Sequence, residues 1–212
     1  MAEEEQKVEE PQKDSQDSTD IISMLSMAAE KSNLRIIGLY GDINEERCAE
    51  AIYSLLTLSQ ETVALTGDDL VDLEQPPIEF YISTYGGQSA EMFSVYDVMR
   101  MAREDVPIYT YGLGKVMSAG VLLLAAGTKG QRRIGKNCRV MIHGVISGQH
   151  GHIADVENEF SEAKMTQKLY VAALAKETTM TEKDIRKMIN KKTNVYIDAE
   201  KAVELGIADI IF

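Results

Sequence analysis

The sequence has few cysteines, no long apolar run and no excess of positive charge, and each shortage excludes a class of protein. Its 212 residues include only two cysteines, Cys48 and Cys138, and their separation matches no metal-binding or redox spacing. Reduced thiols in a cytoplasmic or equivalent reducing compartment are the simplest interpretation. No apolar stretch is long enough to cross a bilayer, and the N-terminus lacks a basic-then-apolar signal pattern. We therefore expect no membrane partner.

The charge of the chain argues against a nucleic-acid partner. The formal net charge is −12 at pH 7, and an acidic protein is repelled by a phosphate backbone. Much of this charge lies in residues 1–20, which are almost all polar and bury too little apolar surface to offset the entropy lost on ordering. We predict a disordered acidic leader over residues 1–20 and a single folded domain over residues 21–212.

Strand-like runs alternate with helical patterns along the folded part. The expected strands are 35–41, 78–83, 106–111, 132–134, 139–143 and 207–212, with a short extended piece at 194–197. The expected helices include a short one at 21–29, one that Asn44 caps, one that a capping box of Thr181 and Asp184 begins, and a long one over 155–177, whereas 57–77 is expected to be mostly loop. Apolar residues at helical spacing, among them Met92 in the helix after 84–87 and Phe160 and Tyr170 in the long helix, are expected to face the core. Glycine-containing turns are expected at 84–87 and 112–114. The alternation predicts an α/β fold with parallel strands joined by helices.

Ser118 and His143 are the candidate catalytic residues. Ser118 lies between a β-type run and a buried apolar run, so it is expected at a helix N-terminus, where free N–H groups favour an oxyanion. His143 ends an apolar strand-like run. A serine hydroxyl is a poor nucleophile unless a base accepts its proton, and the ends of parallel strands bring such groups together. We predict that Ser118 is a nucleophile and His143 its base.

Each of these residues also has a plainer interpretation. Ser118 alone could be a structural cap, and His143 alone a core residue. The pair is more informative, and the backbone N–H groups of Gly87 and Ala119 are the candidate oxyanion donors. The two histidines of the 148–152 loop have no obvious third ligand, so we expect no metal and no cofactor.

Several short motifs occur in a characteristic order along the chain. They are ISTYGG at 82–87, SVYD at 94–97, MSAG at 117–120, RVMIH at 139–143, a glycine-containing loop at 148–151 and AVELGIAD at 202–209. Together they resemble the proteolytic subunit of the Clp protease, the ClpP family. The resemblance spans roughly residues 34–212.

The resemblance implies a fold and an activity. The fold is crotonase-like, with repeated ββα units and with helix 155–177 as a handle between two stacked heptameric rings. The activity is that of a serine endopeptidase that cleaves unfolded polypeptides inside a closed chamber, normally fed by an ATP-dependent AAA+ unfoldase. Nothing in the chain resembles a nucleotide-binding loop. Substrate would bind as an added strand between two edges, formed by Gln88 and Ser89 beside Gly87 on one side and by Ile146, Ser147 and Gly148 on the other.

The chain departs from the family pattern in three places. Asn194 occupies the position of the triad aspartate, next to Thr193 in place of an arginine; in a classical triad the Asp-to-Asn change lowers turnover by about 10⁴. The segment 111–115 is about two residues longer than usual. Glu79 and Tyr81 stand where the family has a tyrosine pair for unfoldase docking. Catalytic activity is therefore expected to be reduced.

Two aspartates near Asn194 allow different interpretations. Asp198 reads as a helix N-cap, with a role as a substitute triad acid left open. Asp209 is expected to be structural.

Two functions follow from these observations. The first is a serine endopeptidase subunit in which Ser118, His143 and Asn194 form the catalytic group. The second is a catalytically weak partner subunit that co-assembles with, and modulates, another ClpP-like ring. A crotonase-type acyl-CoA enzyme would share the fold but has no reason to carry both Ser118 and His143.

Overall fold

The structure of the chain is a computed structural model that describes residues 34–60, 76–191 and 193–212. The predicted leader, the predicted start of the domain at residue 21 and the predicted helix at 21–29 lie outside the described residues. So do residues 61–75 of the predicted loop. No helix within the described ranges is both long and apolar enough to cross a membrane.

The described strands form one sheet. They are β1 (Ile36–Ile43), β2 (Ile78–Gly87), β3 (Ile108–Met117), β4 (Arg133–Ile134), β5 (Arg139–Ile142), β6 (Val195–Ile197) and β7 (Ile210–Ile211). The order is β1-β2-β3-β4-β7, with β5 paired to β3 and β6 paired to β5. All of these pairs are parallel except β5 with β6.

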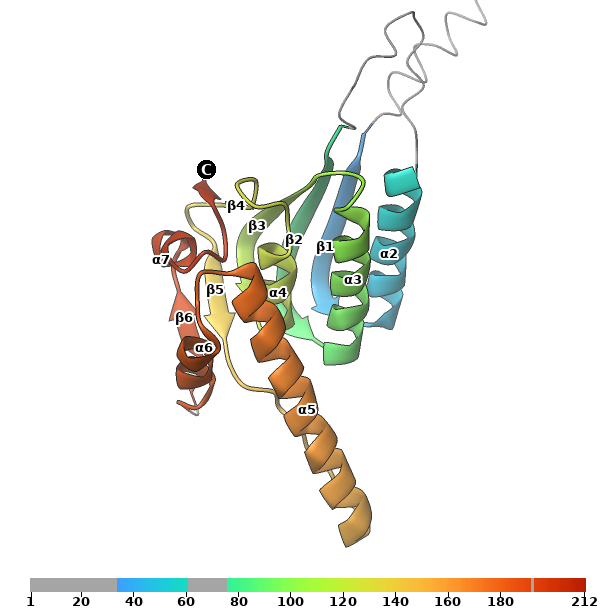
Figure 1. Cartoon of the computed structure of the whole chain (residues 1–212), viewed down its shortest axis with the longest axis vertical. Helices are drawn as coiled ribbons and strands as arrows, with labels where there is room; N and C mark the ends of the chain where they lie inside the picture. Colours follow the sequence, from blue (N-terminus) through green and yellow to red (C-terminus); the bar gives the residue numbers. More distant parts are fainter. Residues whose placement is uncertain (1–33, 61–75, 192) are drawn as a thin grey trace, which may run out of the picture. The chain divides into compact units, whose positions relative to one another are not determined.

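The helices alternate with these strands, which confirms the predicted α/β class. They are α2 (Glu45–Gln60), α3 (Ser89–Ala102), α4 (Ala119–Ala125), α5 (Ile153–Glu177), α6 (Glu182–Ile189) and α7 (Ala199–Glu204). Helix α2 packs on β1, α4 packs on β2 and β3, and α3 lies between α2 and α4 (Figure 1). Every residue of α4 is buried, as expected of a helix that is apolar on all sides.

The capping predictions are confirmed. The Asn44 side chain accepts a hydrogen bond from the backbone N–H of Arg47 at 3.1 Å, at the start of α2. Thr181 and Asp184 form a capping box at the start of α6. The predicted loop at 57–77 is wrong at its beginning, because α2 continues to Gln60.

The two predicted glycine turns are also wrong, because both segments belong to strands. Gly86 and Gly87 end β2 and pair with Asp42 and Ile43 of β1. The alternation of apolar residues gave no sign of this, since glycine breaks the pattern without breaking the ladder. Strand β3 likewise continues through 112–114 to Met117.

Strand β3 contains a bulge just before its end. Between paired positions, β2 takes two steps from Ile82 to Thr84 while β3 takes four steps from Gly112 to Val116, so β3 carries two additional residues there. Gly114, at φ +61°, lies inside the bulge, in a conformation that favours glycine. The longer segment expected before Ser118 is therefore accommodated inside the strand.

Helix α5 is buried only near its C-terminal end. It begins at Ile153, two residues before the predicted start, and its buried residues are Tyr170, Val171, Leu174 and Glu177. The predicted apolar stripe also included Phe160, but 59% of the surface of Phe160 is exposed. Figure 1 shows the first half of α5 extending beyond the sheet.

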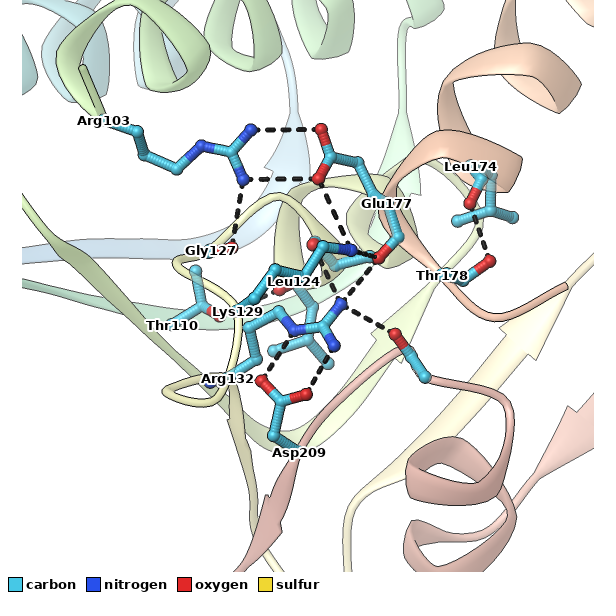
Figure 2. Close-up of polar contacts among 12 residues, drawn as sticks. Arg103, Thr110, Leu124, Gly127, Lys129, Arg132, Leu174, Glu177, Thr178 and Asp209 are labelled. Atoms are coloured by element: carbon cyan, nitrogen blue, oxygen red, sulfur yellow. Dashed lines mark hydrogen bonds and ion pairs between the residues drawn. The ribbon is translucent and has the colours of Figure 1, made fainter.

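A buried carboxylate anchors the C-terminal end of α5 (Figure 2). The Glu177 side chain is 3% exposed and pairs with Arg103, with Nη2 and Oε1 3.1 Å apart. Tyr96 donates a hydrogen bond to the same carboxylate at 3.0 Å. Burial on its own would raise the pKa of Glu177, but the hydrogen bonds and charge of Arg103, helped by Tyr96, hold the pKa below its ordinary value of 4.5. The carboxylate therefore ties α5 to α3.

A second ion pair joins the residues that precede β4 and β7, which are paired strands of the sheet. Arg132 contacts Asp209 through both ends of its guanidinium, at 2.5 Å for Nη2 to Oδ1 and 2.8 Å for Nε to Oδ2. Arg132 also donates to the backbone carbonyl of Glu177 at 2.7 Å. Figure 2 shows the two clusters side by side. These contacts support the structural role expected of Asp209.

We predict that Glu177→Gln destabilises the fold at pH 7 by about 3 kcal/mol, because it leaves the half-buried Arg103 without its charged partner. A carboxylate with a lowered folded-state pKa stabilises the protein above its unfolded pKa, and the effect is lost as pH falls through the folded pKa. The difference between the two proteins, measured by urea unfolding, should therefore shrink below about pH 4.5. Glu162→Gln, at an exposed position on α5, is the control. Equal stabilities of wild type and Glu177→Gln at pH 7 would contradict the assignment.

Candidate functional site

One pocket of about 510 Å³ collects most of the predicted site residues. Gly87 ends β2, Ser118 follows β3 and His143 follows β5, and all three line this pocket. Because the three strands run parallel, their carboxyl ends meet at one edge of the sheet. The sheet topology thus brings residues that are far apart in sequence into the wall of one cavity.

Ser118 has a strained backbone. It is the one non-glycine residue with a positive φ in the described part of the chain, at φ 54° and ψ −120°. Its side chain makes no capping hydrogen bond to α4, although it occupies the N-cap position. Its N–H donates to the carbonyl of Met141 at 2.8 Å, and its carbonyl accepts from the Tyr170 hydroxyl at 3.3 Å. Strain held by surrounding contacts, with the hydroxyl left out of the cap, is typical of a functional serine.

Two glycines make room for Ser118. A Cβ atom at Gly86, which has φ +103°, would lie 2.5 Å from the Cβ of Ser118. A Cβ atom at Gly120 would lie 2.4 Å from Cγ2 of Thr84, and Thr84 accepts a hydrogen bond from the Gly86 N–H at 2.9 Å. The sequences STYGG and MSAG therefore pack against each other, and their glycines are required by close contact.

The proposed oxyanion donors line the same pocket. Ala119 is the first residue of α4, where backbone N–H groups have no partner within the helix. Gly87 lies so close to β1 that a Cβ atom there would be 2.1 Å from the carbonyl oxygen of Ile43. Both backbones thus lie at the cavity that Ser118 also lines.

His143 is held by its own neighbour. Its Nδ1 atom lies 2.5 Å from the carbonyl oxygen of Gly144. Because a carbonyl only accepts hydrogen bonds, Nδ1 carries the proton, which leaves Nε2 unprotonated in the neutral ring. Among the hydrogen bonds of the described residues, none joins His143 to Ser118. The two side chains line one pocket but are not hydrogen-bonded to each other.

Asn194 lies at the surface, next to the strand that precedes His143. The antiparallel register ends with Ile142 of β5 paired to Val195 of β6, so His143 and Asn194 are the neighbouring residues just beyond the last pair. Asn194 and Thr193 are both exposed. No hydrogen bond connects Asn194 with His143 in the described ranges.

Asp198 has the capping role that its position suggested. Its carboxylate accepts a hydrogen bond from the backbone N–H of Lys201 at 2.9 Å, at the start of α7. This contact uses the side chain locally, within the loop and helix that follow β6.

Four of the five predicted substrate-binding residues line one of two cavities. Gln88, Ser89 and Ile146 line the Ser118 pocket, whereas Ser147 lines a neighbouring pocket of about 410 Å³ beside α5. Gly148 is exposed and lines neither pocket, and a Cβ atom there would meet no atom within 4 Å. Both predicted edges thus lie near the pockets.

Three further residues, not predicted from the sequence, shape the site. Met92 and Tyr170 line the Ser118 pocket, and Gln167 accepts a hydrogen bond from the Val145 backbone at 3.1 Å. Burial raises the pKa of the Tyr170 phenol, which stays protonated and able to donate. In the sequence, Met92 and Tyr170 fall at the helical spacing that is typical of core residues, and Gln167 has no distinguishing pattern.

Glu79 and Tyr81 lie at the other end of the strands, away from the Ser118 pocket. The Tyr81 hydroxyl donates to Glu79 at 2.9 Å, and the Tyr111 hydroxyl donates to the second oxygen at 3.1 Å. The two tyrosine rings stack, with centroids 4.4 Å apart. Burial, followed by the hydrogen bond and charge of Glu79, raises the pKa of Tyr81 to about 12. The departure from a tyrosine pair therefore places a carboxylate inside an aromatic cluster.

Comparisons with known proteins point to one family. Residues 14–212 match the family model described as Clp protease. The chain is 36% identical over 136 residues to ATP-dependent Clp protease proteolytic subunit 1 of Corynebacterium glutamicum and to proteolytic subunit 2 of Corynebacterium jeikeium. That segment is 64% of this chain and spans less than two thirds of those relatives, 64% and 63%. Proteolytic subunit 2 of Treponema pallidum is 30% identical over 173 residues, 82% of this chain and 79% of the relative.

We predict that Gly86→Ala lowers the reaction of Ser118 with a serine-reactive fluorophosphonate by at least about tenfold, since the added methyl and the positive φ together displace Ser118. The rate of labelling is followed by fluorescence in gels. Gly135→Ala is the matched control, because a Cβ atom there would be 3.6 Å or more from its neighbours. Equal labelling of Gly86→Ala and wild type would show that the close packing around Ser118 does not set its reactivity.

Proposed function

The chain belongs to the Clp protease family, and we propose that it acts as a subunit of a self-compartmentalised serine endopeptidase that cleaves unfolded polypeptides into short peptides. One observation carries the proposal: a strained serine, a histidine and two candidate backbone donors line a single pocket. The relatives are named as proteolytic subunits of an ATP-dependent protease, which agrees with this activity.

In the proposed mechanism, Ser118 Oγ attacks the scissile carbonyl carbon while Nε2 of His143 takes the hydroxyl proton. The N–H groups of Gly87 and Ala119 stabilise the oxyanion. His143 then gives the proton to the leaving amine, and an acyl group remains on Ser118 until water, activated by the same histidine, releases it. Ser118 and His143 have no direct hydrogen bond in this structure, so rotation of their side chains accompanies substrate binding.

Asn194 takes the place of the triad acid in this proposal. Its amide oxygen could take the hydrogen bond from Nδ1–H only in place of the Gly144 carbonyl that accepts it in this structure, and it carries no charge to balance the imidazolium that forms. The β5–β6 register supports this placement, because His143 and Asn194 are the residues next to the last pair of the ladder, Ile142 with Val195. The expected consequence is a slow enzyme.

Substrate binds as an added strand in the proposed complex. Gln88 and Ser89 follow the end of β2, Ile146 follows β5, and all three line the pocket, so two segments offer it backbone groups. Ser147 and Gly148 would continue the second segment beyond it. Main-chain hydrogen bonds carry little side-chain information, which suits unfolded polypeptides of varied sequence. The apolar side chains of Met92, Val145 and Tyr170 form a wall for one apolar substrate residue.

The proposed partners are further copies of the chain and an AAA+ unfoldase, in a cytoplasmic or equivalent compartment. Large apolar side chains are exposed along α5, namely Ile153, Phe160, Met165 and Leu169. Such a group of side chains suits a subunit contact, as a handle between two stacked heptameric rings would provide. Binding to nucleic acid or to a membrane is not part of the proposal.

A second candidate is a catalytically weak subunit that co-assembles with another ClpP-like ring and modulates it. Two observations favour it: no hydrogen bond joins Ser118 to His143 in the described residues, and Asn194 is exposed. Such a subunit would have the same fold and the same subunit contacts as the first candidate, but a much lower catalytic turnover.

Ser118→Ala should abolish both fluorophosphonate labelling and cleavage of an unfolded protein, because it removes the proposed nucleophile. Ser94→Ala, at an exposed serine of α3, should leave both unchanged. Mass spectrometry of the labelled wild type should locate the adduct on Ser118. Cleavage that survives Ser118→Ala would rule out the proposed nucleophile.

Asn194→Asp should raise the labelling rate by about tenfold or more, because a carboxylate opposite His143 stabilises the imidazolium. Asn190→Asp, at the exposed C-cap of α6, controls for the added negative charge. Labelling in Asn194→Asp but not in wild type would favour the second candidate. No change in either variant would show that residue 194 does not serve His143.

A further inference from the structure

One peptide group links His143 to helix α5. The carbonyl oxygen of Gly144 accepts the hydrogen bond from His143 Nδ1 at 2.5 Å. The N–H of Val145 donates to Oε1 of Gln167 at 3.1 Å. The Gly144 carbonyl and the Val145 N–H belong to the same planar peptide unit, so fixing the direction of one fixes the direction of the other.

Gln167 is so close to this peptide that a side chain at Gly144 would displace the end of Gln167. A Cβ atom at Gly144 would lie 2.9 Å from Oε1 of Gln167. Gln167 is half-buried and lies three residues before Tyr170, on the same face of α5. Tyr170 donates to the Ser118 carbonyl. A single face of α5 therefore contacts the backbone beside both proposed catalytic residues.

We propose that Gln167 is a positioning residue for His143, acting through the Gly144–Val145 peptide group. By accepting from the Val145 N–H, Gln167 holds the Gly144 carbonyl toward Nδ1 and strengthens that carbonyl as an acceptor. The ring then keeps its proton on Nδ1, and Nε2 stays available as the base. The catalytic meaning of this link rests on the function proposed above.

No charged side chain in the pocket lining can orient His143, so its orientation depends on the Gly144–Val145 peptide group. The titratable side chains that line the pocket, apart from His143 itself, are Tyr85 and Tyr170, and the lining includes no carboxylate and no amine. On α5 the facing groups are the neutral Gln167 and the protonated Tyr170. A neutral peptide carbonyl is thus the acceptor that Nδ1 has in this structure. Such an acceptor sets the tautomer without compensating the imidazolium charge.

The test compares two substitutions that differ in hydrogen bonding. Gln167→Met keeps the length of the side chain but removes the acceptor, whereas Gln167→Glu keeps an acceptor oxygen at the same place. Lys168→Met, at the adjacent exposed position of α5, is the control. Each full-length protein is examined in two ways: by the ¹⁵N spectrum of its labelled histidines in the solid state, and by the fluorophosphonate labelling rate as a function of pH.

The spectrum is tractable because the chain has three histidines. His150→Gln and His152→Gln, both in the exposed loop, leave His143 as the one signal. In wild type and Lys168→Met we expect the neutral ring of His143 to carry its proton on Nδ1. In Gln167→Met we expect a mixture of tautomers and a labelling rate about fivefold lower, in keeping with the loss of one hydrogen bond.

Gln167→Glu should restore the Nδ1 tautomer. Its negative charge favours the imidazolium, so the pH at which labelling is half-maximal should move upward. A mere packing role for Gln167 predicts the same tautomer in wild type, Gln167→Met and Gln167→Glu. An unchanged tautomer and an unchanged labelling profile in Gln167→Met would overturn the proposal. If the tautomer responds to Gln167→Met while wild type is not labelled at any pH, the positioning role stands and the proposed peptidase activity fails.

Discussion

The strained backbone of Ser118 is the constraint on which the rest of the site depends. A positive φ at a non-glycine residue persists only where the surroundings impose it, and here β5, α5 and the end of β2 all contact the same residue. The absence of a side chain at Gly86 is part of this arrangement, because any Cβ atom there would overlap Ser118. The bulge in β3 lets the strand reach this point with two additional residues and still remain paired with β5.

Helix α5 connects the site to the rest of the fold. Its C-terminal end is fixed by the buried Glu177 carboxylate. Tyr170 and Gln167, about two and about three turns before that end, contact the backbone at Ser118 and at Val145. The ion pairs of Figure 2 therefore do more than stabilise the core: they set the position of the helix from which both proposed catalytic residues are held. The first half of the same helix has exposed apolar side chains, suited to the subunit contacts of the family.

Much of this could be predicted from the sequence, because the signals were local. The alternation of strands and helices, the buried α4 and the caps at Asn44 and Thr181 are set by residues within a few positions of one another. The ends of β2 and β3 could not be predicted, since glycine is as compatible with a bulge as with a turn and the ladder partner decides between them. The role of Gln167 could not be predicted for a similar reason, because its partner lies 22 residues away and offers only a backbone N–H. The exposed half of α5 showed that an apolar stripe does not reveal whether its partner lies in the same chain.

The most direct measurement is a crystal structure of the protein after reaction with a fluorophosphonate. A nucleophilic Ser118 would carry the phosphonyl group on Oγ, with the phosphonyl oxygen toward the N–H groups of Gly87 and Ala119 and with Nε2 of His143 within hydrogen-bonding distance of the adduct. An unmodified Ser118, or an adduct with the imidazole beyond hydrogen-bonding distance of it, would contradict the pairing of these two residues.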